Sequence, residues 1–339
     1  MTLASLLATA AAAVLACILG LFLFTVAVRA KVMAVLPPKG RFVDVPGARI
    51  HLHESGQGAP ILMIHGLAGQ LSHYTYGIAG RLDRDFRVIA VDRPGSGHSA
   101  RTADACAGLS DQAAALAALI ERLGLRQPLV VGHSLGGAVA LTLALEYPQH
   151  VGGLALIAPL TRMQDEVPPA FEGLTVRSPA VRRLLAWTLA VPSSIRRGRA
   201  TLDQVFGPEA PPADFATRGG ALLGLRPEAF LSASLDLQAL PDCLPALQER
   251  WRDLRLPVSV LYGRDDRILS WQANGRDLVA QVPGARLDLV DGGHMLPVTK
   301  PEACAAFIRR AYADLVAART AQATGTGDTG SSTGSGAPR

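Results

Sequence analysis

Residues 129–145 read LVVGHSLGGAVALTLAL, and this stretch decides the fold. Its first three residues are branched and apolar, as in a buried strand, and the run after the glycines is long enough for a buried helix. A serine in such a strand–turn–helix projects its hydroxyl beyond the strand end, above the N-terminus of the helix. We therefore predict that Ser134 is a nucleophile and that Gly132 and Gly136 let the turn pack closely.

Two loops further along the chain supply partners for Ser134. A serine hydroxyl at its ordinary pKa is a poor nucleophile and needs a histidine base that a carboxylate orients. One apolar run (258–262) is followed by GRDDRI, and the next (286–290) is followed by DGGHM. His294 is the predicted base, and Asp265 and Asp266 are the candidate acids. The chain order of serine, acid and histidine predicts a catalytic triad.

Two backbone N–H groups are predicted to form an oxyanion hole. Such donors face the negative charge that develops on a substrate oxygen, and removing one costs roughly 3 kcal/mol. One donor follows the nucleophile, at Leu135. The other is expected in a loop after an early strand, and His65-Gly66-Leu67 follows the apolar run 61–64. Leu67 is therefore the predicted second donor.

Short apolar runs alternate with longer Ala- and Leu-rich helical patterns, which indicates parallel strands joined by helices. The predicted strands are residues 42–45, 49–54, 61–64, 88–91, 129–131, 154–158, 258–262 and 286–290. The first two are joined by Pro46-Gly47 and predict a hairpin. This pattern predicts an α/β fold with a mostly parallel sheet of eight strands.

One long interval breaks this alternation. Residues 161–255 hold helical patterns and Pro-rich joints without a run of comparable β character, so we interpret them as a helical cap over the sheet edge. Within the cap, the stretch from Arg177 to Arg199 has six arginines and no acid around spaced apolar residues, which predicts an amphipathic helix. Such a helix could pack on the active site with solvated arginines outside, or could rest on a membrane surface.

Five motifs resemble those of the α/β-hydrolase superfamily and occur in the same order. They are HGL (65–67), DRPGSGHS (92–99), GHSLGG (132–137), GRDDRI (263–268) and GGHMLPVTKPE (292–302). The resemblance covers residues 41–318 and implies a doubly wound sheet, with core parts at 41–160 and 256–318 on either side of the cap. In the family's G-x-x-D pattern the acid is the third residue after glycine, which selects Asp266 over Asp265.

The N-terminus carries a long apolar stretch. No charged residue occurs from Leu3 to Val28, and about 20 apolar residues suffice to cross a bilayer as a helix. A cleaved signal peptide has a basic start and an apolar core of roughly 7 to 15 residues, and this stretch has neither feature. We therefore predict a single membrane-spanning anchor at residues 1–30. Basic residues follow it, which favours a cytoplasmic location for the rest of the chain. The opposite topology stays open, because a single signal-anchor helix can translocate a long domain despite such charges.

The two ends of the chain complete the predicted layout. A membrane helix joined to such a domain is similar to membrane-anchored monoacylglycerol lipases and bacterial inner-membrane phospholipases of the superfamily, which implies a place in a bacterial inner membrane. At the other end, residues 319–339 are rich in Gly, Ser and Thr and are predicted to form a disordered tail.

Three other kinds of site fit the sequence poorly. The segment GSGHSA at 95–100 matches a dinucleotide-binding fingerprint, but no helical pattern begins at its glycines. His51 and His53 alternate on one strand without a third metal ligand at useful spacing. The 33 basic residues are interleaved with 28 acids and form no tract suited to nucleic acid. We expect no cofactor, no metal and no nucleic-acid partner.

These features predict a serine hydrolase that cleaves carboxylic esters. The anchor and the apolar, basic cap favour a lipid-like substrate such as a monoacylglycerol or a lysophospholipid. The same triad could instead hydrolyse a carbon–carbon bond, or carry out cofactor-free perhydrolysis, on a small soluble substrate. A non-catalytic binding protein of this fold is a third interpretation, although such proteins commonly lose a triad member. Dehalogenases and epoxide hydrolases of the superfamily have an Asp nucleophile, which Ser134 argues against.

Overall fold

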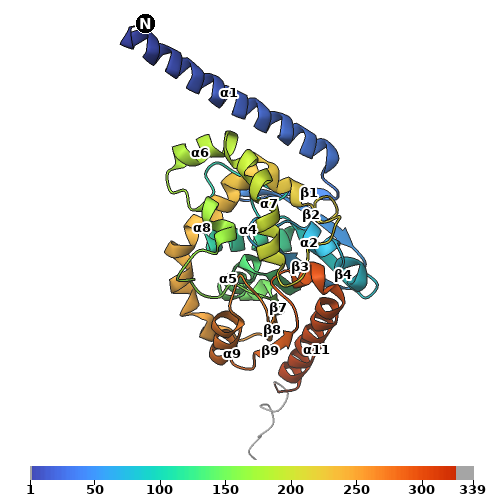
Figure 1. Cartoon of the computed structure of the whole chain (residues 1–339). Helices are drawn as coiled ribbons and strands as arrows, with labels where there is room; N and C mark the ends of the chain where they lie inside the picture. Colours follow the sequence, from blue (N-terminus) through green and yellow to red (C-terminus); the bar gives the residue numbers. More distant parts are fainter. Residues whose placement is uncertain (1, 326–339) are drawn as a thin grey trace, which may run out of the picture.

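A central β-sheet organises the chain. The computed structural model describes residues 2–325, and Figure 1 shows helices on both faces of this sheet and one long helix that projects from the folded body. The strand order is β1-β2-β4-β3-β6-β7-β8-β9, and the two-residue strand β5 pairs with β2 off this path. Strands β1 and β2 form an antiparallel hairpin, β2 is antiparallel to β4, and all later neighbours on the path are parallel. The predicted mostly parallel sheet of eight strands is confirmed, with β5 as a short addition.

The strands follow the predicted apolar runs to within a residue or two, apart from β5, which was not predicted. They are β1 (Arg41–Val45), β2 (Ala48–Ser55), β3 (Ala59–Ile64), β4 (Phe86–Val91), β5 (Ala100–Arg101), β6 (Leu129–His133), β7 (Gly153–Ile157), β8 (Val258–Gly263) and β9 (Arg286–Val290).

Helices cover both faces of the sheet. Successive side chains of a strand point to opposite faces, so each buried strand has apolar side chains on both faces. In β3, Leu62 and Ile64 join a core cluster with the helices of one face, whereas Ile61 and Met63 join the cluster of the other. The first face carries α4 (Leu109–Arg122), α5 (Leu135–Glu146), part of α8 (Pro227–Gln248) and α9 (Asp277–Gln281). The second face carries α2 (Ser72–Thr75), α3 (Ala79–Leu82), α10 (Leu296–Thr299) and α11 (Pro301–Gly325). The doubly wound architecture is therefore confirmed.

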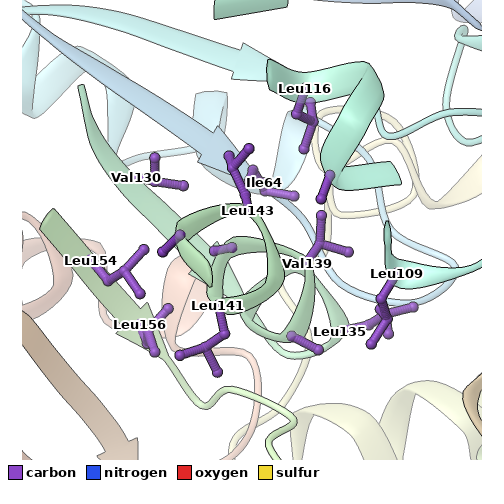
Figure 2. Packing of buried hydrophobic residues seen from close by; sticks show 14 of the residues in the cluster. Ile64, Leu109, Leu116, Val130, Leu135, Val139, Leu141, Leu143, Leu154 and Leu156 are labelled. Atoms are coloured by element: carbon purple, nitrogen blue, oxygen red, sulfur yellow. The ribbon is translucent and has the colours of Figure 1, made fainter. Parts of the chain in front are cut away.

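Helix α5 lies at the centre of the first cluster. Its first ten residues are all buried, so it is apolar all round rather than amphipathic. Figure 2 shows Leu141 of α5 on the side of Leu156 from β7, in the same buried cluster as Val139, Leu143 and Leu116 of α4. This packing holds the N-terminus of α5, and with it the turn that contains Ser134, against the end of β6.

The segment between β7 and β8 is helical. It contains η2 (Pro169–Leu174), α6 (Pro179–Trp187), α7 (Ala190–Phe206), η3 (Ala221–Leu225), α8 and η4 (Trp251–Asp253). The amphipathic stretch from Arg177 to Arg199 is not one helix as predicted, because α6 ends at Trp187 and α7 begins at Ala190. Pro192 gives the physical reason: its ring would clash with the carbonyl of Thr188 in a continuous helix, whereas the first turn of a new helix tolerates it.

The terminal helices both extend beyond their predicted limits. Helix α1 (Leu3–Val35) has 33 residues and is long and apolar enough to cross a membrane, by length and composition. Helix α11 continues to Gly325, so the predicted boundary at 319 falls inside it. The segment Arg319-Thr320-Ala321 continues this helix, and the Arg319 guanidinium donates to the Gln127 carbonyl at 2.9 Å. The rest of the predicted tail, residues 326–339, lies outside the described residues.

Candidate active site

Ser134 occupies a sharp turn between β6 and α5. Its backbone has φ 54° and ψ −123°, a region that residues with a side chain rarely adopt, and which is held only where the surroundings enforce it. The Ser134 N–H donates to the Ile157 carbonyl of β7 at 3.1 Å, and its own carbonyl accepts from Gly137 and Leu160. The turn is thus fixed by hydrogen bonds on both sides.

Glycine is required at the two predicted positions of this turn. A Cβ on Gly136 would lie 2.2 Å from the Ile64 carbonyl oxygen, and one on Gly132 would lie 2.5 Å from the Gly136 carbonyl oxygen. Real Cβ atoms do not approach backbone so closely. The absence of these two side chains therefore lets the end of β3 pack directly against the Ser134 turn.

His294 and Asp266 form a buried pair in the loops after β9 and β8. The distance from His294 Nδ1 to Asp266 Oδ2 is 2.7 Å, and the Asp266 side chain has no exposed surface. The other oxygen of Asp266 accepts from the N–H groups of Ile268 and Leu269 at 2.8 and 2.9 Å. These bonds aim the carboxylate at the imidazole. Asp265 is exposed, and no hydrogen bond links it to His294 in the described part of the chain.

His133 links the His294 loop to the Ser134 turn. The Nε2–H of His133 donates to the His294 carbonyl at 3.0 Å, and the two rings lie 4.9 Å apart between centroids. Burial, helped by the neighbouring His294, holds the pKa of His133 well below its usual value, so the ring is neutral. Since His133 directly precedes Ser134, this bond brings the loop of the predicted base to the predicted nucleophile.

Both predicted oxyanion donors lie beside this turn. Leu135 is the first residue of α5, so its N–H has no acceptor within the helix. Leu67 follows Gly66, where an added Cβ would lie only 2.9 Å from the Cβ of Ser134. Within residues 2–325, no protein oxygen accepts a hydrogen bond from the N–H of Leu67 or Leu135. Both N–H groups are therefore unpaired within the described residues.

A buried arginine that sequence reasoning missed holds the loop of Leu67. Arg93 has no exposed surface, and its guanidinium donates to the carbonyls of His65 and Gly66 at 2.9 and 3.0 Å. Its backbone N–H donates to Nε2 of His65 at 2.9 Å. Burial, together with the charge of Arg93, holds the pKa of His65 well below its usual value. The only sequence signal was a charged residue inside the motif DRPGSGHS, directly after an apolar strand.

The remaining motifs do not form separate sites. The glycines at 95 and 97 lead into β5 and a loop, and the next helix, α4, begins only at Leu109, so the arrangement is unlike a dinucleotide-binding turn. His51 is buried and its Nδ1 bonds to Asp92 Oδ2 at 2.7 Å. Among residues 2–325, no three His, Cys, Asp or Glu side chains gather in a way that could hold a metal ion.

An apolar cavity opens at Ser134, between the sheet edge and the segment after β7. Its enclosed free volume is about 80 Å³. Apolar side chains form most of its wall: Leu67, Leu135, Leu160, Met163, Val167, Pro168, Phe171, Leu237, Leu240, Ile268 and Leu269. Arg162, Gln164 and Glu166 also line the cavity and provide polar groups. The cavity therefore suits a largely apolar substrate with a reactive group at Ser134.

A second hollow lies away from Ser134, between β9 and α11. It is lined by Arg286, Asp288, Arg310 and Asp314 among others, and these charges pair with one another. Ser259 also lines this hollow, but its lining residues include no histidine and no member of the predicted triad.

Comparisons with known proteins agree with this geometry. The chain matches the family described as Alpha/beta hydrolase family over residues 61–307. It is 31% identical over 245 residues to 2-hydroxy-6-oxo-6-phenylhexa-2,4-dienoate hydrolase of Burkholderia cepacia, covering 70% of this chain and 82% of the relative. It is 28% identical to 2-hydroxymuconate semialdehyde hydrolase of Pseudomonas putida, covering 82% and 95%.

Solved structures share the fold. One is a membrane phospholipase A described as a bacterial virulence factor (TM-score 0.65, 24% identity), for which the match covers 92% of this chain and 97% of that one. Another is a thermophilic esterase from Thermogutta terrifontis (TM-score 0.62, 24% identity), with coverage of 81% and 99%. At these identities the structures show a common fold alone. The family match, the relatives and the arrangement around Ser134 together establish that the chain is a hydrolase that belongs to the α/β hydrolase family.

Proposed function

We propose that the chain is a serine hydrolase that cleaves carboxylic esters with lipid-like acyl chains. The observation that carries the proposal is the strained turn of Ser134 at an apolar cavity, next to the buried pair of His294 and Asp266. A strained backbone conformation at a serine is typical of a nucleophile, because the sharp turn makes the hydroxyl face the reacting group.

In the proposed mechanism the hydroxyl of Ser134 attacks the ester carbonyl while Nε2 of His294 takes its proton. Asp266 holds the Nδ1–H of His294, fixes its tautomer and stabilises the imidazolium that forms. The N–H groups of Leu67 and Leu135 receive the negative charge on the carbonyl oxygen. The proton then passes from His294 to the leaving alcohol, and water releases the acyl group from Ser134 by the same route.

The cavity wall and helix α1 support a lipid-like substrate. The wall is mostly aliphatic, so an acyl chain would bury apolar surface at about 0.8 kcal/mol for each methylene group. Helix α1 is proposed to anchor the chain in a membrane, which would give the cavity access to lipid esters.

The proposal is tested with a fluorophosphonate probe and a substrate panel on the full chain. We expect the probe to label the wild-type chain and not Ser134→Ala, because only an activated serine reacts. Monoacylglycerols, lysophospholipids and p-nitrophenyl esters of increasing chain length would then be compared. Labelling that persists in Ser134→Ala, or turnover without any dependence on the acyl chain, would exclude the proposed function.

A second candidate is hydrolysis of a carbon–carbon bond. The relative from Burkholderia cepacia is named for a dienoate substrate that contains no ester, so its hydrolysis breaks a carbon–carbon bond. Arg162 lines the cavity and could face such a carboxylate, although it also bonds to Asp277 at 3.4 Å. Turnover of a 2-hydroxy-6-oxo-dienoate that exceeds ester turnover, and is lost in Arg162→Gln, would favour this candidate.

A further inference from the structure

Helix α6 contacts helix α1 within its apolar stretch. The rings of Trp187 and Phe22 lie 5.7 Å apart between centroids, and the hydroxyl of Thr25, which has no exposed surface, lies 3.5 Å from the Thr188 carbonyl. Figure 1 shows α6 beside α1 at this end of the folded body. The contact fixes the height of α6 along α1.

Arg29 marks the aqueous end of the apolar stretch. It is the first charged residue of α1, and its Nε lies 2.6 Å from a carboxylate oxygen of Glu228. At 1.5 Å per residue, Thr25 and Phe22 lie roughly 6 and 10 Å further toward the apolar end. A helix that touches α1 at this height lies at the bilayer surface or below it, the depth at which tryptophan is enriched in membrane proteins.

The outer side of α6 is apolar and uncovered. Val181, Leu184 and Leu189 are 46%, 53% and 48% exposed. Val181 and Leu184 lie on α6, six and three residues before Trp187, and Leu189 lies in the link between α6 and α7. Exposed apolar residues gathered next to a membrane-spanning helix are typical of a lipid-facing surface rather than of scattered surface residues.

Arginines flank this apolar surface. Arg177, Arg183, Arg196 and Arg197 are exposed, and within residues 2–325 no carboxylate lies within ion-pair distance of them. Arg182 differs, because it is buried and donates to the Val176 carbonyl. The stretch from Arg177 to Arg199 has no acid, so its positive charge is available to anionic headgroups.

We propose that α6 and the start of α7 are embedded in the surface of a bilayer that contains anionic phospholipids. Val181, Leu184 and Leu189 lie among the upper parts of the acyl chains, and the four free arginines bind headgroup phosphates. The inference rests on the proposed membrane anchor α1 and extends it to a second, lateral contact. Phe171, eight residues before α6 begins, lines the cavity of Ser134, so the cavity wall and the proposed lipid contact belong to the same segment.

The depth of α6 is measured with a fluorophore on an introduced cysteine. Leu184→Cys is made in the full chain after Cys17→Ala and Cys106→Ser, which remove the exposed thiols, and is labelled with NBD. The protein is placed in nanodiscs of equal phosphatidylcholine and phosphatidylglycerol, with nitroxide on the acyl chains as quencher. Val316→Cys is the matched control, because Val316 is a 43% exposed apolar residue on α11, away from α1. Val14→Cys reports on α1 itself.

We expect the emission at position 184 to be blue-shifted and strongly quenched, like that at 14 and unlike that at 316. Arg183→Gln with Arg196→Gln should reduce quenching at 184, whereas Arg122→Gln with Arg126→Gln on the exposed surface at the end of α4 should not.

If the fluorophore at position 184 is quenched no more than that at 316, while the one at 14 is quenched, the proposal is overturned and the anchor stays intact. If 14 is also unquenched, the anchor fails and the inference fails with it. A blue shift that disappears when each nanodisc holds one chain would show that a second copy covers this surface, which also overturns it.

Discussion

The guanidinium of Arg93 and the carboxylate of Asp236 form an ion pair with no exposed surface on either side chain, at 2.7 Å between Nη1 and Oδ2. Arg93 lies just after β4 and also donates to the carbonyls of His65 and Gly66. Asp236 lies on α8, in the segment between β7 and β8. The pair therefore joins that segment to the loop whose Leu67 N–H is the proposed oxyanion donor.

Arg93→Met should lower both stability and turnover. The change leaves Asp236 with only one cationic partner and removes the donors of two buried carbonyls, so the free energy of unfolding should fall by about 3 kcal/mol. The value of kcat should fall as well, because the loop of Leu67 loses its support. Arg101→Met is the matched control: Arg101 also bonds to Asp236 at 2.7 Å, but it does not contact the loop. Thermal unfolding and ester turnover check both variants, and equal kcat in the two would contradict this role for Arg93.

Asp266→Asn and Asp265→Asn should differ sharply. Asparagine at 266 cannot hold the Nδ1–H tautomer of His294, and a change of this kind in a serine protease triad lowers kcat about 10⁴-fold. Asp265 is exposed and makes no bond to His294, so its replacement should leave kcat within about twofold of the wild type. Steady-state ester hydrolysis distinguishes them. A large loss in Asp265→Asn would show that the acid has been assigned to the wrong neighbour.

The sheet could be predicted from the sequence because its signals are local. Each buried strand is a short branched apolar run, and the turn of Ser134 has its glycines within two residues on either side. The relevant chemistry lies in loops directly after strands, and parallel strands bring these loops to one edge of the sheet. Pairs such as His294 and Asp266 are therefore placed together once the strand order is known.

Contacts between distant segments could not be predicted in this way. Arg93 and Asp236 are separated by 143 residues, and no sequence pattern around either residue indicates that the two form an ion pair. The break between α6 and α7 does have a local signal, Pro192, but the pattern of spaced arginines and apolar residues alone does not show it. The contact of Thr25 with the Thr188 carbonyl at this break, by contrast, joins segments 163 residues apart. The predicted start of the C-terminal tail at residue 319 was wrong for a different reason. Residues after 318 continue helix α11 as far as Gly325.

Stability should fall as the pH drops below about 6.5. His65 and His133 are buried, and their burial keeps the pKa of each well below the usual value. Above pH 6.5 both rings are neutral in the folded and unfolded chain, so they add no pH dependence. Below it the unfolded chain takes up protons that the folded chain does not, and each ring costs about 1.4 kcal/mol per pH unit.

A variant separates this effect from the titration of carboxylates. His133→Gln keeps a donor for the His294 carbonyl but removes one titrating ring, so the slope of unfolding free energy between pH 6 and 5 should decrease by about 1.4 kcal/mol per unit. Denaturant unfolding at pH 7, 6 and 5 measures the slopes of wild type and variant. Identical slopes would mean that His133 is already protonated in the folded chain.

Leu237→Trp should shift the enzyme toward shorter acyl chains. Leu237 lines the cavity from α8, and an indole there would occupy space that the proposed acyl chain needs. Each methylene excluded from the apolar wall loses about 0.8 kcal/mol, or about fourfold in kcat/KM, so the loss should grow with chain length and vanish for acetate esters. Leu235→Trp is the matched control on the same helix, because Leu235 is 39% exposed and is not part of the cavity wall. Kinetics on p-nitrophenyl esters from acetate upward test the prediction. A uniform loss at every chain length would indicate that the acyl chain does not occupy this wall, and would place the leaving group there instead.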